Sequence, residues 1–201
     1  MELFTVPTSP YARIVRVLLI EKGVPLSAVK HTEVTLRDPA STLLPHNPVG
    51  RVPTLRLDDG TILTETILIA RYLDVTLPGR QLFPGPADAK ANAALGTALG
   101  FMEGVVAWLR EARRPVELVS QSLLELERTR AARTLDRFEK ELPQTQEAAP
   151  DIGDVVRAVS LYTGEERVKL DWRAARPRLK AWGEAMLARP SFVQTLPPAK
   201  T

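Results

Sequence analysis

The feature that most constrains the fold is a stretch rich in proline and glycine, residues 78–86 (PGRQLFPGP). Such a stretch interrupts regular structure and is typical of a boundary between domains. Before it, short apolar runs alternate with segments of helical spacing, whereas after it every periodic segment has helical spacing. We therefore expect two domains, residues 1–78 and 87–201, joined by a linker over 79–86.

The first domain is expected to combine a small mixed sheet with packed helices. Ser9 followed by Pro10 is typical of a helix start, since serine is a favoured N-cap and proline suits the first helical position. Gly23 is a plausible end for that helix. The predicted order is strand, helix, strand, loop, two strands and helix, over residues 2–6, 10–22, 28–34, 37–50, 52–57, 61–63 and 66–77.

The second domain is expected to be an α bundle, because its apolar residues repeat at helical spacing. The helices are predicted over residues 87–112, 116–142, 151–163 and 175–189, with Gly164 ending the third. Asp151 and Asp154 have the spacing of a capping box at the start of that third helix.

Composition excludes several classes of function. The 201 residues contain no cysteine, so neither a disulfide framework nor a protein thiol is available. With only His31 and His46, no zinc spacing appears, and no metal is expected. The net charge of +3 comes without a basic stripe, so no nucleic-acid partner is expected. Because neither a signal peptide nor an apolar run of ~18–20 residues is visible, we expect a cytoplasmic protein without a membrane partner.

Residues 47–55 (NPVGRVPTL) resemble the signature of cytosolic glutathione S-transferases. Residues 8–13 (TSPYAR), the pair Glu65-Thr66 and residues 151–154 (DIGD) fall in that family's order and spacing, so the resemblance covers nearly the whole chain. Residues 110–115 and 189–192 resemble one bacterial branch of the family. The resemblance implies a thioredoxin-like N-terminal domain followed by an all-helical C-terminal domain.

The resemblance also implies how glutathione would be bound. The peptide bond between Val52 and Pro53 would be cis, and the backbone of Val52 would pair with the cysteinyl part of glutathione; a trans proline at a strand start is the alternative. Thr66 would hold the γ-glutamyl carboxylate at a helix N-terminus, with Glu65 on the ammonium. Plain helix capping is compatible with both roles.

The glycine end of glutathione needs a cation. Arg51 is the stronger candidate and His46 the second, with Lys30 and Arg37 as alternatives. A solvated loop residue is the competing interpretation of His46.

Ser9 is the candidate catalytic residue. Thiolate rather than thiol is the nucleophile, and a hydroxyl that donates to the sulfur at a helix N-terminus favours the charged form. Thr8 and Tyr11 are competing hydroxyls, and Ser9 as a mere N-cap is the alternative.

An electrophile pocket is expected between the Ser9 loop and the first long helix of the second domain. Tyr11, Phe101, Val105 and Trp108 are its candidate lining, although such residues at helical spacing are more often core. Glu103, on the same helix, matches an acidic residue that in some relatives reaches the partner subunit's glutathione; an exposed helix charge is the alternative.

These residues predict a glutathione transferase that acts on a small hydrophobic electrophile in detoxification, with glutathione as co-substrate. The resemblance to the family implies a homodimer. One alternative is a binding protein of the same fold that holds glutathione or a hydrophobic ligand. Another is a different glutathione-dependent reaction, namely isomerisation, dehalogenation or peroxide reduction.

Overall fold

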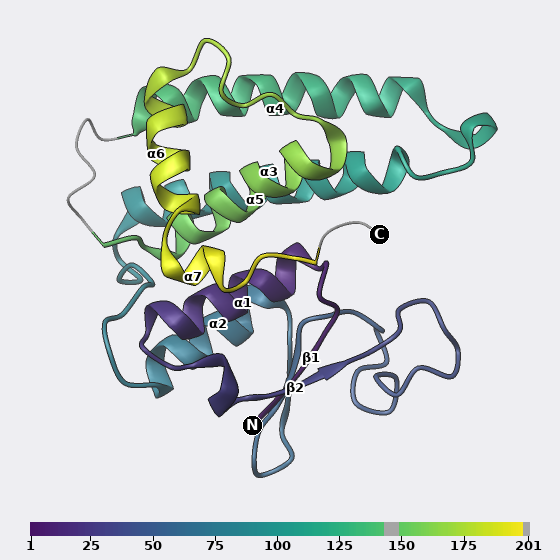
Figure 1. The fold of residues 1–201 in the computed structure, drawn as a ribbon, viewed down its shortest axis with the longest axis vertical. Helices are drawn as coiled ribbons and strands as arrows, with labels where there is room; N and C mark the ends of the chain where they lie inside the picture. Colours follow the sequence, from purple (N-terminus) through teal and green to yellow (C-terminus); the bar gives the residue numbers. More distant parts are fainter. Residues whose placement is uncertain (143–148, 199–201) are drawn as a thin grey trace. The chain divides into compact units, whose positions relative to one another are not determined.

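The computed structural model describes residues 1–142 and 149–198. The chain forms two compact units (Figure 1). The first comprises Met1–Phe83 together with the segment that begins at Pro190, and the second comprises Pro84–Arg189. The predicted fold class, a thioredoxin-like half and a helical half, is confirmed.

The first unit is built on a four-stranded mixed sheet of order β2-β1-β3-β4, with β1 parallel to β2 and antiparallel to β3. The helices α1 and α2 pack against each other, and α2 also packs on β3 and β4. The elements are β1 (Glu2–Thr5), α1 (Pro10–Glu21), β2 (Lys30–Glu33), β3 (Thr54–Arg56), β4 (Ile62–Thr64), α2 (Thr66–Thr76) and α7 (Pro190–Val193). All the predicted strands and helices of this half are present. The strands β1, β2 and β3 are shorter than predicted, whereas β4 has the predicted length and is displaced by one residue.

A buried ion pair ties α1 to α2. Lys22 Nζ lies 3.1 Å from Asp74 Oδ1, and both side chains are essentially inaccessible to solvent. Asp74 also accepts hydrogen bonds from the backbone N–H groups of Leu82 and Phe83. Gly79, at φ 96°, lets the chain pass so close to Lys22 that a Cβ there would lie 2.8 Å from the Lys22 carbonyl oxygen. Residues 79–83, where the chain leaves the first unit, are therefore held in place by a buried ion pair and hydrogen bonds as well as by apolar packing.

The C-terminal segment lies along α1. The Ser191 hydroxyl donates to Glu21 at 2.5 Å near the end of α1. The Arg13 guanidinium, one turn after the start of α1, donates to the Phe192 carbonyl at 3.1 Å and to the Thr195 hydroxyl at 3.3 Å. The segment therefore runs antiparallel to α1 and covers the buried Arg13 side chain.

The second unit is a helical bundle in which α3 packs against both α4 and α5. Its helices are α3 (Ala89–Glu111), α4 (Gln121–Glu141), α5 (Ile152–Val168) and α6 (Pro177–Leu187). A 3-10 turn, Val116–Leu118, precedes α4. By length and composition alone α3 could cross a membrane, a test that core helices of soluble proteins also pass. Here its buried residues face α4 and α5.

The prediction that Gly164 ends the third helix of this half is wrong. Helix α5 continues to Val168 and ends at Lys169, which adopts the left-handed conformation at φ 59°. Gly164 lies inside the helix because the chain folds back on it: a Cβ at this position would lie 2.8 Å from a methyl carbon of Leu170. The glycine is thus required for close approach, not for termination. The predicted capping box is confirmed, with Asp151 and Asp154 each accepting from the other's backbone N–H.

Candidate functional site

Three sequence motifs meet at one edge of the sheet. Phe4 on β1 pairs with Thr54 on β3, and Thr54 pairs with Thr64 on β4. Because β3 is antiparallel to both neighbours, its start lies beside the ends of β1 and β4. Pro53 precedes β3 at this edge, the loop to Ser9 leaves it, and Glu65 follows β4 there. The helices α1 and α2 both begin at this edge, so two helix N-termini contribute partial positive charge to it.

Ser9 is the N-cap of α1, as predicted. Its Oγ accepts a hydrogen bond from the Ala12 N–H at 3.2 Å, and its own N–H donates to the Val6 carbonyl at 2.9 Å. Among the described residues no group accepts the Ser9 hydroxyl proton, so the oxygen can cap the helix while the proton remains available to a ligand. Of the competing hydroxyls, Thr8 is exposed and Tyr11 is half-buried.

The peptide bond between Val52 and Pro53 is cis, as the family resemblance implies. Val52 is buried, in an apolar cluster with Phe4, Val34 and Leu43 that underlies this edge of the sheet. The backbone just before β3 is therefore held in place by the packing of the Val52 side chain in this cluster.

Asn47 fixes the loop that carries Arg51. Its side-chain amide donates to the Arg51 carbonyl at 3.1 Å and to the Thr54 hydroxyl at 2.9 Å, and its oxygen accepts from the Val49 N–H at 3.0 Å. Asn47 is buried, so this network is shielded from water. Sequence reasoning assigned no role to Asn47; the available signal was an asparagine in a Pro- and Gly-rich loop, where such side chains often bond to nearby backbone.

The charged candidates at this edge have no ion-pair partner in the described part of the chain. Arg51 is exposed, and its guanidinium forms no ion pair with a carboxylate of residues 1–142 or 149–198. Glu65 is also exposed and its side chain makes no capping hydrogen bond. Both charges are thus available to a ligand that carries groups of both signs.

Glu65 has an uncommon backbone conformation, with φ 65° and ψ 123°. For a residue other than glycine this costs on the order of 1–3 kcal/mol, and such residues concentrate at ligand sites. Thr66, the first residue of α2, is only 8% exposed. The turn therefore presents the start of α2 to the sheet edge at a local energetic cost.

The remaining cation candidates are placed differently. His46 is half-buried, and its ring lies against Phe4 with ring centroids 4.9 Å apart. Lys30 forms an ion pair with Glu2 at 3.0 Å, at the opposite end of β1 from this edge. The structure therefore separates Lys30 from the other candidates. Arg37 is exposed in the loop after β2, at φ 66°.

The pocket candidates from the second unit are buried in its core. Phe101, Val105 and Trp108 are at most 8% exposed. Phe101 packs edge-on against Phe138, with ring centroids 5.4 Å apart. Glu103 is exposed on α3. No group of three or more His, Asp or Glu within residues 1–142 and 149–198 is arranged to hold a metal ion.

Comparison with known proteins identifies what this arrangement is similar to. Residues 3–81 match the family described as glutathione S-transferase, N-terminal domain. A glutathione S-transferase from Methylobacillus flagellatus, crystallised with glutathione bound, is 32% identical, with a TM-score of 0.88 and coverage of 98% of this chain and 99% of that one. A glutathione transferase family member from Pseudomonas fluorescens Pf-5, with bound glutathione, is 33% identical with a TM-score of 0.87 and the same coverage. The uncharacterised GST-like protein YibF of Escherichia coli is 26% identical, over 98% of this chain and 99% of its own length.

Proposed function

Because this chain belongs to the glutathione S-transferase family, we propose that it is a glutathione transferase in which Ser9 stabilises the glutathione thiolate for attack on a small hydrophobic electrophile. The observation that carries the proposal is the Ser9 hydroxyl. It caps α1 as an acceptor and keeps its proton for an external acceptor at a helix N-terminus. A hydrogen bond and a helix dipole that favour the anion both lower a thiol pKa.

The reaction follows from these residues. The Ser9 hydroxyl donates a hydrogen bond to the sulfur, and the thiol proton leaves to solvent. The thiolate then forms a carbon–sulfur bond with the electrophile, either by displacing a leaving group that departs with its electron pair or by adding to a polarised double bond whose other carbon takes a proton from solvent. Ser9 is therefore a hydrogen-bond donor and not a nucleophile. Lowering the thiol pKa by one to two corresponds to about 1.4–2.7 kcal/mol.

Glutathione is proposed to lie along the sheet edge. Its γ-glutamyl carboxylate would meet the N-terminus of α2 at Thr66, and its ammonium would meet the Glu65 carboxylate. The backbone of Val52, before Pro53, would pair with the cysteinyl part. Arg51, with His46 as the second candidate, would hold the glycine carboxylate. The unpaired charges of Arg51 and Glu65 support this assignment, since each has a counterpart on glutathione.

The electrophile pocket stays a prediction from the sequence: Tyr11 is half-buried in the first unit, whereas Phe101, Val105 and Trp108 are at most 8% exposed in the second. A homodimer is also proposed, supported by Leu68 and Val75 on one face of α2, which are 63% and 68% exposed. Light scattering that gives only the 22.2 kDa of a single chain would reject the dimer. Cytoplasmic location and a role in detoxification stay predictions from the sequence.

The test is conjugation of glutathione to a panel of electrophiles by the native protein and by Ser9→Ala. We expect turnover to fall about 10- to 100-fold at neutral pH, in line with the lost thiolate population. Glutathione affinity measured by calorimetry is expected to change little. Unchanged turnover in the variant would reject the role of Ser9.

Two alternatives are also tested by these measurements, because the relative YibF is uncharacterised: a non-catalytic binding protein and an enzyme for another glutathione-dependent reaction. Glutathione binding by calorimetry without turnover on any electrophile would favour a binding protein of this fold. Turnover only with isomerisable, halogenated or peroxide substrates would favour one of the other glutathione-dependent reactions.

A further inference from the structure

Two side chains hold the carbonyl group of Arg51 at the same time. The Asn47 amide donates to it at 3.1 Å, and the Thr54 hydroxyl donates to it at 2.9 Å. The same amide also donates to the Thr54 hydroxyl at 2.9 Å, so the three groups form a closed triangle. Asn47 is 2% and Thr54 0% exposed, so water does not compete for these bonds. Because two donors occupy both lone pairs of the Arg51 carbonyl oxygen, its direction is fixed.

The direction of this carbonyl also sets the direction of the Val52 N–H. The two groups belong to one planar trans peptide, in which the C=O and the N–H point in opposite directions. Because the carbonyl is tied to Asn47 and Thr54 inside the unit, the N–H points away from them. Arg51 is exposed, so this peptide lies at the surface of the unit.

The Val52 N–H has no acceptor within residues 1–142 and 149–198. The next residue, Pro53, carries no N–H, and Thr54 already pairs with β1 and β4. Val52 therefore supplies the last backbone donor before β3. Val52 is 8% exposed, and an N–H group without an acceptor in a largely buried residue costs free energy. This N–H therefore favours a ligand that brings a carbonyl oxygen.

We propose that Thr54 is a positioning residue for the binding of glutathione. Its hydroxyl, together with the Asn47 amide, holds the Arg51 carbonyl so that the Val52 N–H meets the cysteinyl carbonyl of glutathione. Thr54 is fully buried and acts only through this peptide. The inference rests on the proposed function, because it takes glutathione to lie along this edge of the sheet. It extends that proposal from the residues that face glutathione to a buried hydroxyl behind them.

The experiment is calorimetric titration of the full chain with glutathione, for the native protein, Thr54→Val and Thr54→Ser. Valine keeps the shape of the threonine side chain without the hydroxyl, whereas serine keeps the hydroxyl. We expect Thr54→Val to bind glutathione about 3- to 10-fold more weakly, as the loss of one hydrogen bond implies, and Thr54→Ser to stay within about twofold of the native affinity. Equal affinity of Thr54→Val and the native protein, or an equal loss in both variants, would overturn the proposal.

A second ligand separates the Val52 N–H from the Arg51 side chain. The ethyl ester of γ-glutamylcysteine keeps the cysteinyl carbonyl but lacks the glycine carboxylate that Arg51 is proposed to hold. Thr54→Val should weaken the binding of both ligands by the same factor, whereas Arg51→Ala should weaken the binding of glutathione alone. If Thr54→Val weakens only glutathione, the hydroxyl acts through the Arg51 side chain, and the proposed positioning of the Val52 N–H is wrong.

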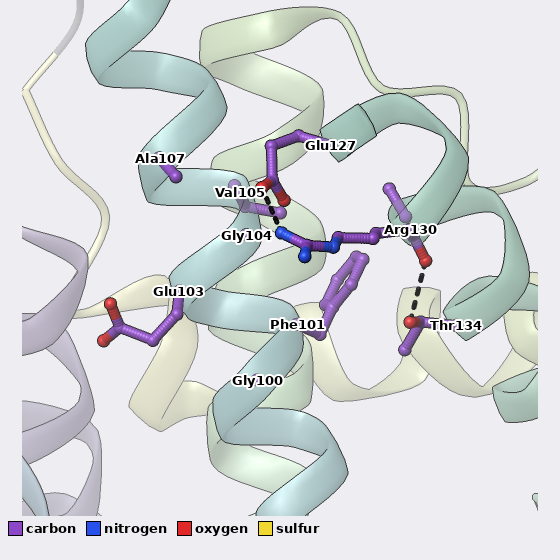
Figure 2. A pocket seen from close by; sticks show the side chains of 10 residues that line it. Gly100, Phe101, Glu103, Gly104, Val105, Ala107, Glu127, Arg130 and Thr134 are labelled. Carbon is purple, nitrogen blue, oxygen red and sulfur yellow. Dashed lines mark hydrogen bonds and ion pairs between the residues drawn. The ribbon is translucent and has the colours of Figure 1, made fainter. Parts of the chain in front are cut away.

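Thr134→Val is the matched control. The Thr134 hydroxyl also donates to a carbonyl, that of Arg130, at 2.9 Å. It lies on α4 in the second unit, where Figure 2 shows it among the residues that line a pocket between α3 and α4. This variant should keep the native affinity for both ligands. Thermal unfolding of each variant confirms that the titrations are made on folded protein.

Asn47→Asp removes both donors of the Asn47 amide and keeps its acceptor. The carboxylate still accepts the Val49 N–H, as the amide oxygen does at 3.0 Å, but in its ionised form it cannot donate to the Arg51 carbonyl. We expect it to bind glutathione at least about tenfold more weakly, since it loses two hydrogen bonds. Native affinity in Asn47→Asp would show that the turn at Val49 is sufficient, and the proposal would be wrong.

Failure of the proposed function is distinguishable from failure of this inference. If the native protein binds no glutathione, both are wrong. If it binds glutathione and conjugates no electrophile, while Thr54→Val still weakens binding and Thr54→Ser does not, the transferase activity is rejected and the role of Thr54 is supported. If the native protein conjugates glutathione and Thr54→Val binds it equally well, only the role of Thr54 is rejected.

Discussion

At the sheet edge of the first unit, Arg51 and Glu65 carry charges that no described residue neutralises. In the second unit, by contrast, Asp151 and Asp154 cap each other's backbone, and Arg157 pairs with Asp154 at 3.1 Å between the rings of Phe138 and Trp182. Polar groups that are satisfied within a fold contribute to its stability, whereas those left open at a helix start are available to a ligand. The difference supports the proposed glutathione site in the first unit and a structural role for the Asp151, Asp154 and Arg157 side chains of the second.

Removal of one partner of the Lys22–Asp74 pair should have the largest effect on stability. Asp74→Asn leaves the Lys22 ammonium buried without a counter-charge, so we expect the free energy of unfolding to fall by about 3–5 kcal/mol. Denaturant unfolding monitored by circular dichroism measures it. The control is Arg137→Ala, which breaks the exposed pair with Glu141 on α4 and should cost at most about 0.5 kcal/mol. If both variants lose the same free energy of unfolding, the buried Lys22–Asp74 pair is no more important for stability than an exposed pair, and the prediction is wrong.

Packing in the second unit can be tested at Gly183 on α6. A Cβ there would lie 2.7 Å from the Trp172 ring, which is fully buried. Gly183→Ala should therefore destabilise the protein by about 1–3 kcal/mol through overpacking. Gly96→Ala on α3, where a Cβ meets nothing, should instead stabilise it by up to about 1 kcal/mol through helix propensity. Thermal unfolding of both variants gives the sign of each change.

The first unit should lose stability in acid through Glu2. Hydrogen bonds from Thr32 and Lys30 and the charge of Arg56 lower the pKa of Glu2 from 4.5 to about 2. Because the folded-state pKa is the lower one, the stabilisation is complete above pH 4.5 and is lost as the pH falls towards 2. We expect a loss of about 2 kcal/mol, reduced by the exposure of Lys30 and Arg56.

Glu2→Gln provides the control for this acid effect. It removes the titrating group, so its free energy of unfolding should depend less on pH between 4.5 and 2 than that of the native protein. Parallel curves for the two proteins would show that Glu2 does not carry the effect.

The smallest predicted effect compares two helix N-caps. Ser9→Ala and Asp151→Ala each remove a side chain that accepts a backbone N–H, and each should cost about 1 kcal/mol of stability. Only Ser9→Ala should also reduce glutathione conjugation. If Asp151→Ala lowers turnover as much at equal folded fraction, the functional contrast between the two units fails.

The sequence predicted local features well because their causes are local. The Ser9 cap, the capping box at Asp151 and the start of α2 at Thr66 each depend on a few adjacent residues, and all three are present. The cis bond before Pro53 was implied by the family signature. Gly164 was misread because the residue that requires it, Leu170, contacts it only after the chain turns back at Lys169.

Contacts between residues far apart in the sequence could not be predicted from the spacing of apolar residues. The bonds from Arg13 to Phe192 and Thr195 join residues about 180 positions apart. The hydrogen-bond network of Asn47 depends on how its loop returns to β3, and the φ of Glu65 depends on how β4 meets α2. Such features follow from packing and not from local pattern.

The most direct test of the central claim is a pH titration of the thiolate absorbance of glutathione bound to the native protein, to Ser9→Ala and to the control Asp151→Ala. A free thiol has a pKa of about 8.5. The role assigned to Ser9 predicts that the pKa of the bound glutathione thiol is lower than the free value by about one to two in the native protein and in Asp151→Ala, and that it returns towards the free value in Ser9→Ala. A native bound pKa equal to that of free glutathione, or a lowered pKa that persists in Ser9→Ala, would contradict it.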